Sequence, residues 1–314
     1  MKFTFGTDPE FFLSKNDKIY SAIGIVKGTK DRRKKIGNCA FYYDNVLAEC
    51  AIPPGKSKKE TLDNIRDCLK KYANLVAPYK LETKASHVFA PDQLRHEAAR
   101  EVGCSPESCA YLVEDLQPNE ELFLKNNLRS AGGHIHLGST LLKEGFNSIV
   151  SILLLDLFLG IPSIFIDHDP TTKKRKELYG QAGRWRYPEY GVEYRSVGNF
   201  WLSSPQLVDL VYDICQFVLN FIEDGRWKLL WHIDEDRLKS DEAWSDPDFH
   251  PNQCYRCIGY NAQDLRKSID GVDLILGERF LDFIEKLLPN EIYSRIIKFS
   301  TLPQFDFYKE WELT

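Results

Sequence analysis

The feature that most constrains the fold is a strict alternation at the start of the chain, KFTFGTDPEFFL, residues 2–13. Successive side chains of a β-strand point to opposite faces, so a period of two predicts a strand. One face is apolar, and the other holds Asp8 and Glu10 together. Because Pro9 has no amide hydrogen to donate, we expect the pairing to be interrupted or bulged beside these two acids.

Residues 39–54 predict a β-hairpin that turns at Asp44–Asn45, with Pro53–Pro54 stopping the pairing. The spacing of Ser57 and Glu60 is that of a capping box, which predicts a helix that ends before Pro78. "YGVEYRSVG" is typical of a strand. Other helices are expected at about 145–160, after Asp169–Pro170, after Ser204–Pro205, and around 262–269, 277–288 and 290–299.

The apolar run at 148–166 has nominally the length of a membrane span. Asp156, Gly160 and Pro162 interrupt it, and no aromatic or basic anchors flank it. We therefore predict a buried helix followed by a strand, in a soluble protein.

Strand patterns are concentrated in the first two-thirds of the chain and helical patterns in the last third. This order predicts an α+β fold, a mostly antiparallel twisted sheet with helices packed on one face. With 314 residues and 43% hydrophobic side chains the chain can bury a large core. We predict a single domain over 1–314, in which 1–200 form the sheet core with the motifs and 201–314 form a helical C-terminal part.

Charge and cysteine usage indicate the compartment and the kind of partner. A net charge of −5 gives no bulk electrostatic reason to bind nucleic acid or an anionic membrane. The start of the chain lacks a signal-peptide pattern. Cys50, Cys68 and Cys215 stand singly in apolar surroundings, which is typical of reduced thiols in a cytoplasm. Cys254 and Cys257 could combine with Cys104 and Cys109 as a zinc site, although plain thiols are the simpler interpretation.

Ionisable residues recur in one phase of four predicted strands: Asp8 and Glu10, Glu49, His134 and His136 in AGGHIHLG, then Glu193 and Arg195. Residues two apart in a strand lie about 6–7 Å apart on one face. Carboxylates gathered on one surface raise each other's pKa unless a cation lies among them. Carboxylate oxygens favour a hard divalent ion such as Mg²⁺, and a histidine among them indicates Mg²⁺ or Mn²⁺. The alternative is a chance alignment of surface acids.

A second group is the arginines Arg175, Arg184, Arg186 and Arg195, which are interleaved with Tyr and Trp in residues 175–196. The guanidinium fork matches phosphate and carboxylate oxygens. Arginines beside metal-binding acids indicate phosphoryl transfer from a nucleotide. A solvated basic surface is the alternative, most plausible for Arg175, which has lysines around it. The cationic run at 27–35 could contact phosphates too, or could be a solvated loop.

Four motifs, GTDPEFFL, LAECAIPP, AGGHIHLG and GRWRYPEYGVEYRS, occur in this order between residue 6 and about 198. On these motifs the chain resembles the glutamine synthetase-like carboxylate–amine ligases, more narrowly the phage-type COOH–NH2 ligases of type 2. The resemblance implies a glutamine synthetase-like catalytic fold. It also implies ATP and Mg²⁺ (or Mn²⁺) as cofactors, acid and amine substrates that are small molecules or peptides, and a host cytoplasm if the chain is phage-encoded.

The resemblance also implies roles for individual residues. Glu10 and Glu49 would hold one divalent ion, and Asp8, His134 and Glu193 the other. Arg195 would face the γ-phosphate, with Arg184 or Arg186 on phosphate or on the substrate carboxylate, and Arg175 is a further candidate for binding ATP. His136 contacts ATP or supports the strand. Asp8 stands where glutamine synthetase has Glu, so its shorter side chain has less reach.

The implied activity is amide formation through an acyl phosphate, with Glu193 and the arginines carrying the catalysis. The glycines of AGGHIHLG would then admit the triphosphate close to the backbone. Two other functions remain open: a guanidino or carboxylate kinase on the same fold, and a protein that binds nucleotide or metal without turnover. The identity of the substrates and the oligomeric state are not indicated by the sequence.

Overall fold

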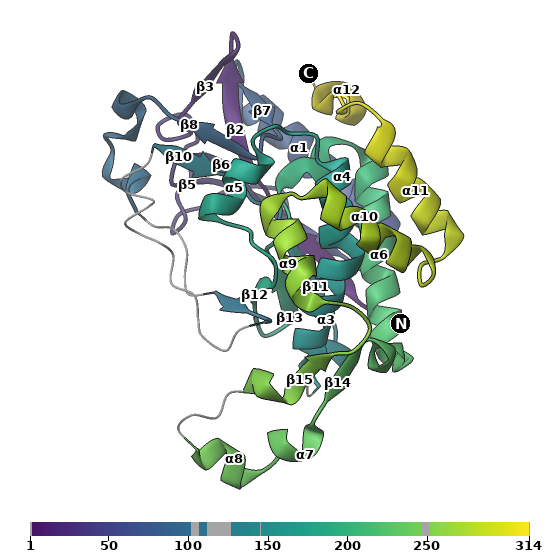
Figure 1. The fold of residues 1–314 in the computed structure, drawn as a ribbon. Coiled ribbons are helices and arrows are strands. Elements are labelled where there is room, and N and C mark those ends of the chain that lie inside the picture. Colours follow the sequence, from purple (N-terminus) through teal and green to yellow (C-terminus); the bar gives the residue numbers. More distant parts are fainter. Residues whose placement is uncertain (1, 102–106, 112–126, 145, 247–250, 314) are drawn as a thin grey trace.

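A computed structural model of the chain describes residues 2–101, 107–111, 127–144, 146–246 and 251–313 (Figure 1). An 11-stranded sheet runs in the order β3-β2-β6-β1-β11-β13-β12-β9, with β5 on β6, β4 on β5 and β7 on β2. The described strands that make up this sheet are β1 (Thr4–Thr7), β2 (Glu10–Lys15), β3 (Lys18–Tyr20), β4 (Lys34–Ile36), β5 (Cys39–Asp44), β6 (Leu47–Gly55), β7 (Lys80–Glu82), β9 (Ser108–Cys109), β11 (Ile135–Gly138), β12 (Arg184–Arg186) and β13 (Gly191–Tyr194). Two small sheets pair β8 (Ser86–Val88) with β10 (Leu128–Ser130) and β14 (Trp231–Ile233) with β15 (Tyr255–Cys257).

The strand pairs of the described chain are antiparallel, which confirms an α+β fold built on a mostly antiparallel sheet. The described helices are α1 (Lys58–Val76), α3 (Asn147–Leu155), α4 (Ile161–Ile166), α5 (Thr172–Leu178), α6 (Pro205–Glu223), α7 (Glu235–Leu238), α8 (Asp241–Ser245), α9 (Ala262–Gly271), α10 (Leu274–Glu285), α11 (Asn290–Thr301) and α12 (Phe307–Trp311).

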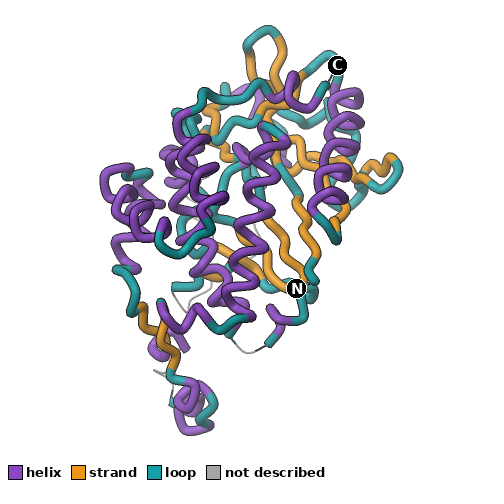
Figure 2. Tube along the Cα trace, turned by 90° about the vertical axis from the view of Figure 1, so that its right-hand side faces the viewer, coloured by secondary structure: helices purple, strands orange, loops and turns teal. Residues whose placement is uncertain are grey.

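Helices α1 and α3 pack on the sheet, and α6 packs against both of them, so the long helices lie side by side (Figure 2). The core between these layers is formed by one phase of the strands. In the row Phe5, Leu137 and Val192, directly opposed on β1, β11 and β13, each side chain is almost fully buried. Phe5 also packs on Tyr212 of α6, with ring centroids 5.7 Å apart. The opposite phase of the same strands is left for the ionisable residues.

Local sequence signals set several element boundaries as predicted. The pairing stops at Asp8–Pro9, which separates β1 from β2. The hairpin β5–β6 turns after Asp44, with Asn45 at a positive φ of 54°. The side chain of Ser57 accepts from the N–H of Glu60 at the start of α1, and Ser204 accepts from Leu207 at the start of α6. These caps satisfy amide groups that have no partner inside the helix.

Three expectations about these elements are wrong. Strand β6 continues through Pro53–Pro54 to Gly55, because a register shift in the β1–β6 pairing takes up two residues that cannot donate. Residues 161–166 are helical instead of forming a strand. Pro162 lies in the first turn of α4, where its missing N–H costs little, and a π-helical turn at Asp156–Gly160 joins α3 to α4. The C-terminal part also holds the β14–β15 hairpin, which extends downward with α7 and α8 in Figure 1.

Within the described residues, one helical stretch, Asn147–Ile166, is apolar and long enough to cross a membrane. In its apolar part, however, 89% is buried inside the protein. It fits the buried helix that the interrupted apolar run predicts.

Candidate functional site

The register of the strands places the predicted ionisable residues in two rows on the sheet face opposite α1, α3 and α6. In the first row, Gly6, His136, Glu193 and Arg186 are directly opposed across β1, β11, β13 and β12. In the second row, Glu10, Glu49 and Tyr42 are opposed across β2, β6 and β5. Directly opposed side chains of antiparallel strands share a face. Segments that are far apart in the sequence therefore present their acids and imidazoles to the same region.

Asp8 lies at the break between β1 and β2 and contacts both histidines. Its Oδ1 is 3.1 Å from Nδ1 of His134 and 2.9 Å from Nε2 of His136. Nδ1 of His134 is also 3.6 Å from a carboxylate oxygen of Glu193. Ligand atoms of Asp8, His136 and Glu193 all lie within 4.8 Å of one another. Burial alone would raise the pKa of Asp8, but the charge of His136 and the hydrogen bonds from both imidazoles hold it well below its usual range.

Glu10, Asp44 and Glu49 form a second group whose oxygens lie within 4.8 Å of one another. One oxygen of Glu49 accepts from the hydroxyl of Tyr42 at 2.6 Å, and Glu10 accepts from the amide of Gly132 at 2.6 Å. The other oxygen of Glu49 is buried and has no hydrogen-bond partner among the described residues. Burial and the charges of Asp8, Glu10 and Asp44 raise the pKa of Glu49 well above its usual range.

An unpaired buried carboxylate oxygen among three acids is costly unless a cation balances it. The group offers carboxylate oxygens, which are the ligands that hard divalent ions prefer. The residues therefore fit a divalent cation here. The group of Asp8, Glu193 and the histidines offers a mixed oxygen and nitrogen set, which suits Mg²⁺ or Mn²⁺. Asp44 is a member of the second group that the motif-based prediction did not include.

Three arginines lie beside the buried acids Glu193 and Glu107, with increasing exposure. The side chain of Arg195 is 5% exposed and donates to Glu193, and its Nε donates to Glu107 at 2.9 Å. Nη1 of Arg184, 17% exposed, is 3.2 Å from the other oxygen of Glu107. Nη1 of Arg186, 26% exposed, is 3.9 Å from Glu193. Arg195 is thus held by two buried acids, and Arg184 and Arg186 are more accessible to a ligand. Glu107 was not foreseen, because its short segment carries no recognisable motif.

Tyr179, at the end of α5, is a second residue that was not foreseen. Its hydroxyl is 3.1 Å from Nε2 of His134, the ring nitrogen on the side away from Asp8. The guanidinium carbon of Arg195 lies 5.2 Å from the centre of the tyrosine ring. One side chain thus contacts both a candidate metal ligand and a candidate phosphate-binding arginine.

The expected contact of Arg175 with ATP is not supported by its position. Arg175 is fully buried, and its guanidinium donates to the carbonyl oxygens of Ala131, Ser196 and Val197 at 2.8–3.1 Å. These bonds tie the residues before β11 to those after β13. Arg175 therefore orders the backbone of the site.

The glycines of AGGHIHLG make room for protein atoms. A Cβ at Gly132 would lie 2.5 Å from Nε2 of His134, and one at Gly133 would lie 2.4 Å from the carbonyl oxygen of Gly198. The space that we expected for the triphosphate is therefore filled, at these two positions, by the imidazole and by backbone.

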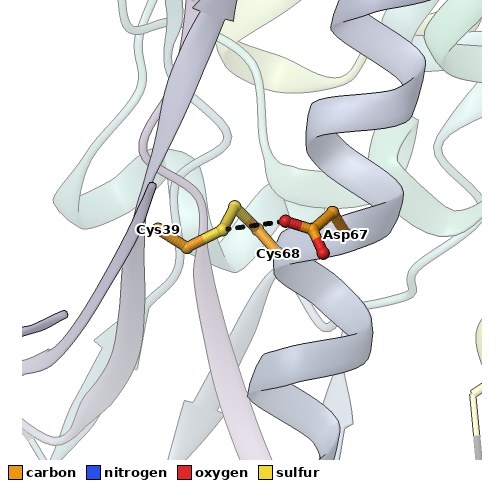
Figure 3. A group of neighbouring side chains, drawn as sticks. All are labelled: Cys39, Asp67 and Cys68. Atoms are coloured by element: carbon orange, nitrogen blue, oxygen red, sulfur yellow. Dashed lines mark hydrogen bonds between the residues drawn. A yellow bond between two sulfur atoms is a disulfide. The ribbon is translucent and has the colours of Figure 1, made fainter. Parts of the chain in front are cut away.

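The cysteines differ in part from the prediction. Cys39 of β5 and Cys68 of α1 form a disulfide, and a carboxylate oxygen of Asp67 lies 3.8 Å from the sulfur of Cys39 (Figure 3). The prediction of a single reduced thiol is therefore wrong for Cys68. The two cysteines are 29 residues apart in sequence, and the packing of α1 on the hairpin brings their Cα atoms to 5.6 Å. Cys50 and Cys215 are free and buried, as predicted.

The zinc alternative gains no support within the described residues. Cys109, Cys254 and Cys257 are free thiols there, and none belongs to a close group of three potential metal ligands. Cys104, the fourth cysteine of that alternative, lies outside the described residues.

Part of the chain matches a known family. Residues 127–228 match the family model of the phage phiEco32-like COOH–NH2 ligases of type 2. This segment, the ligase segment, is similar to that family of carboxylate–amine ligases. No curated protein matches the chain. The ligase segment contains both histidines, Glu193 and the arginines, whereas Asp8, Glu10 and Glu49 lie outside it and reach the site through β1, β2 and β6.

Proposed function

We propose that the protein is an ATP-dependent carboxylate–amine ligase, which forms an amide bond through an acyl phosphate. The family of residues 127–228 supports a ligase of this class. The observation that carries the proposal is the convergence of five ionisable side chains from separate strands and their connections onto one face of the sheet: Asp8, Glu10, Glu49, His134 and Glu193.

Two cation positions follow from the two groups of ligands. Glu10, Asp44 and Glu49 would hold one divalent ion, and Asp8, Glu193 and a histidine would hold the other. When bound, such ions neutralise the charge of a triphosphate and orient its terminal phosphate. His134 and His136 both contact Asp8, so the choice of imidazole ligand is open to experiment.

The side chains of this protein would contribute positioning and charge. Arg186 beside Glu193 and Arg184 beside Glu107 are partly exposed, so we assign them to phosphate or to the carboxylate of the acid substrate. Arg195, fixed between Glu193 and Glu107, would place positive charge at the γ-phosphate. As the γ-phosphoryl group moves to the substrate carboxylate, ADP leaves with the bridging oxygen. An amine then attacks the acyl carbon, releasing phosphate and a proton and leaving an amide.

The test is a screen of amino-acid and short-peptide pairs with MgATP, following ADP, phosphate and new masses. We expect ADP formation that requires an amine and a product heavier than the acid by the amine minus water. A phosphorylated product that accumulates without an amine would indicate a kinase. Nucleotide binding without ADP release would indicate a protein that has lost turnover.

Site variants test the residues themselves. Glu10→Gln and Glu193→Gln are each expected to abolish turnover of MgATP with unchanged circular dichroism. Glu189→Gln is the matched control, because Glu189 is an exposed glutamate of the turn before β13. Normal turnover in both site variants would refute the assignment.

A further inference from the structure

A cationic edge lies on the same sheet face as the candidate site, beyond the second group of acids. Lys35 of β4 is directly opposed to Ala40 of β5, which is opposed to Ala51 of β6. Tyr42 and Glu49, two residues along from Ala40 and Ala51, are opposed to each other. Because side chains two apart in a strand share a face, Lys35 faces the same side as Glu49. Adjacent strands lie about 5 Å apart, so Lys35 is about two strand spacings from β6.

Two more cations border the second group of acids at this edge. The guanidinium carbon of Arg33 lies 4.5 Å from the ring centre of Tyr42, whose hydroxyl donates to Glu49. The ammonium of Lys30 is 2.7 Å from Asp44. Through these contacts, Tyr42 connects Arg33 at the edge with Glu49 among the acids.

Two of the charges at this edge, those of Arg33 and Lys35, are open to a ligand. Arg33 and Lys35 are exposed, and the structure pairs neither with a carboxylate in the described part of the chain, whereas it pairs Lys30 with Asp44. Residues 27–35 hold six Lys and Arg side chains and a single acid, Asp31, in a protein whose net charge is −5. Like charges held close together with few acids among them repel one another, and a bound anion would relieve that repulsion.

The acids therefore have cations on both flanks. On one side, Arg186 of β12 and Arg195, which follows β13, lie beside Glu193, and Arg184 lies beside Glu107. On the other side, Arg33 and Lys35 lie beyond Glu49 toward β4 and β5, next to the Lys30–Asp44 pair. If the triphosphate binds the arginines on the β12–β13 side, the cations on the β4–β5 side are available to the other anionic reactant, which is the acid substrate.

We propose that Arg33 and Lys35 form a second anion subsite, which binds a carboxylate of the acid substrate other than the one that reacts. The acid substrate is then an oligocarboxylic acid, such as a dicarboxylic acid or a short acidic peptide. This inference rests on the proposed function, because it presumes that the adjoining centre phosphorylates a carboxylate.

Isothermal titration tests the subsite with tri-L-glutamate and tri-L-glutamine, a pair that differs in side-chain charge. Mn²⁺ and a non-hydrolysable ATP analogue are present. We expect tri-L-glutamate to bind wild type more tightly than tri-L-glutamine. The double variant Arg33→Gln/Lys35→Gln should lose about tenfold in affinity for tri-L-glutamate, the sum expected from two exposed ion pairs. The matched control, Lys286→Gln/Lys298→Gln, removes two exposed lysines of the helical layer and should bind as wild type does.

Equal affinity for the two peptides, or an equal loss in both double variants, would overturn the subsite. So would tighter binding of a short oligothymidylate than of tri-L-glutamate, with the same dependence on Arg33 and Lys35. Binding of the ATP analogue to wild type is measured separately. Analogue binding without a preference for tri-L-glutamate refutes this inference alone, whereas the absence of analogue binding refutes the proposed function as well.

Discussion

Replacing Glu49 by Gln should make the metal-free protein more stable while weakening its response to divalent ions. Glu49 is 6% exposed and lies among Glu10, Asp44 and Asp8, and one of its oxygens has no partner in the described residues. At pH 7 the folded protein must either carry this charge or bind a proton that the unfolded chain does not hold. A glutamine avoids both costs. Its oxygen can still accept from Tyr42, and its amide can donate to Glu10 or Asp44.

The size of the effect follows from this choice. Protonating a carboxyl of ordinary pKa, 4.5, at pH 7 costs about 3 kcal/mol, so the gain in unfolding free energy is at most of this order. For a chain of 314 residues, the entropy of unfolding makes 1 kcal/mol equivalent to about 1.5 °C in Tm. We therefore expect Glu49→Gln to melt about 2–4 °C above wild type in EDTA. A divalent ion at 100 times its Kd adds about 2.7 kcal/mol to wild type, or about 4 °C.

The assay is thermal unfolding by circular dichroism in EDTA and in Mn²⁺, for wild type, Glu49→Gln and the control Glu285→Gln, an exposed glutamate of α10. In wild type and in the control, Mn²⁺ should raise the melting temperature by the amount due to both groups of ligands. Glu49→Gln should gain only the part due to the group around Asp8. A lower melting temperature than wild type in EDTA, or an undiminished Mn²⁺ shift, would refute the reasoning.

Three further predictions concern residues around the site. Tyr179→Phe should weaken Mn²⁺ binding about 10–100-fold in electron paramagnetic resonance titrations. The substitution removes the hydrogen bond to Nε2 of His134 but keeps the ring beside Arg195. Unchanged affinity for Mn²⁺ would show that Tyr179 does not support His134 as a metal ligand. Arg175→Met should cost about 3–5 kcal/mol in chemical denaturation, since it leaves three carbonyl oxygens without their donor, and a cost below 1 kcal/mol would contradict the structural role. Burial raises the pKa of Asp156 from 3.8 to about 7, so folding favours the protonated form of this carboxyl. Wild type should therefore lose stability as the pH rises from about 4 to about 7. Over that range, denaturation curves should show Asp156→Asn gaining up to about 4 kcal/mol relative to wild type, and a pH-independent difference would refute the shift.

Much of the site was predictable because β-structure has a period of two. The phase of Asp8 and Glu10 in the first strand, and of His136 and Glu193 in later ones, assigns each residue to a face without reference to the partner strand. The same rule applied to β5 would have included Asp44, which shares a phase with Tyr42. Its position at the reversal of the hairpin indicates only a turn residue.

Glu107 and Tyr179 could not be found in this way. Glu107 reaches Arg195 across 88 residues of sequence, and Tyr179 reaches His134 from the end of a short helix. Contacts of this kind depend on how separate elements dock, and no local pattern of residues encodes that. The same holds for the Cys39–Cys68 disulfide, whose partners lie on a strand and a helix.

The sequence by itself determined which residues face away from the core and which segments begin with a cap, because alternation and capping are properties of neighbouring residues. Only the tertiary structure decided which strands lie next to one another, and with it the inclusion of Asp44 among the acids, the burial of Arg175 and the position of the cationic edge. The physical reason is that pairing and packing free energies are summed over contacts between distant segments. A pattern read along the chain can show which residues are available for such contacts, but not which of them meet.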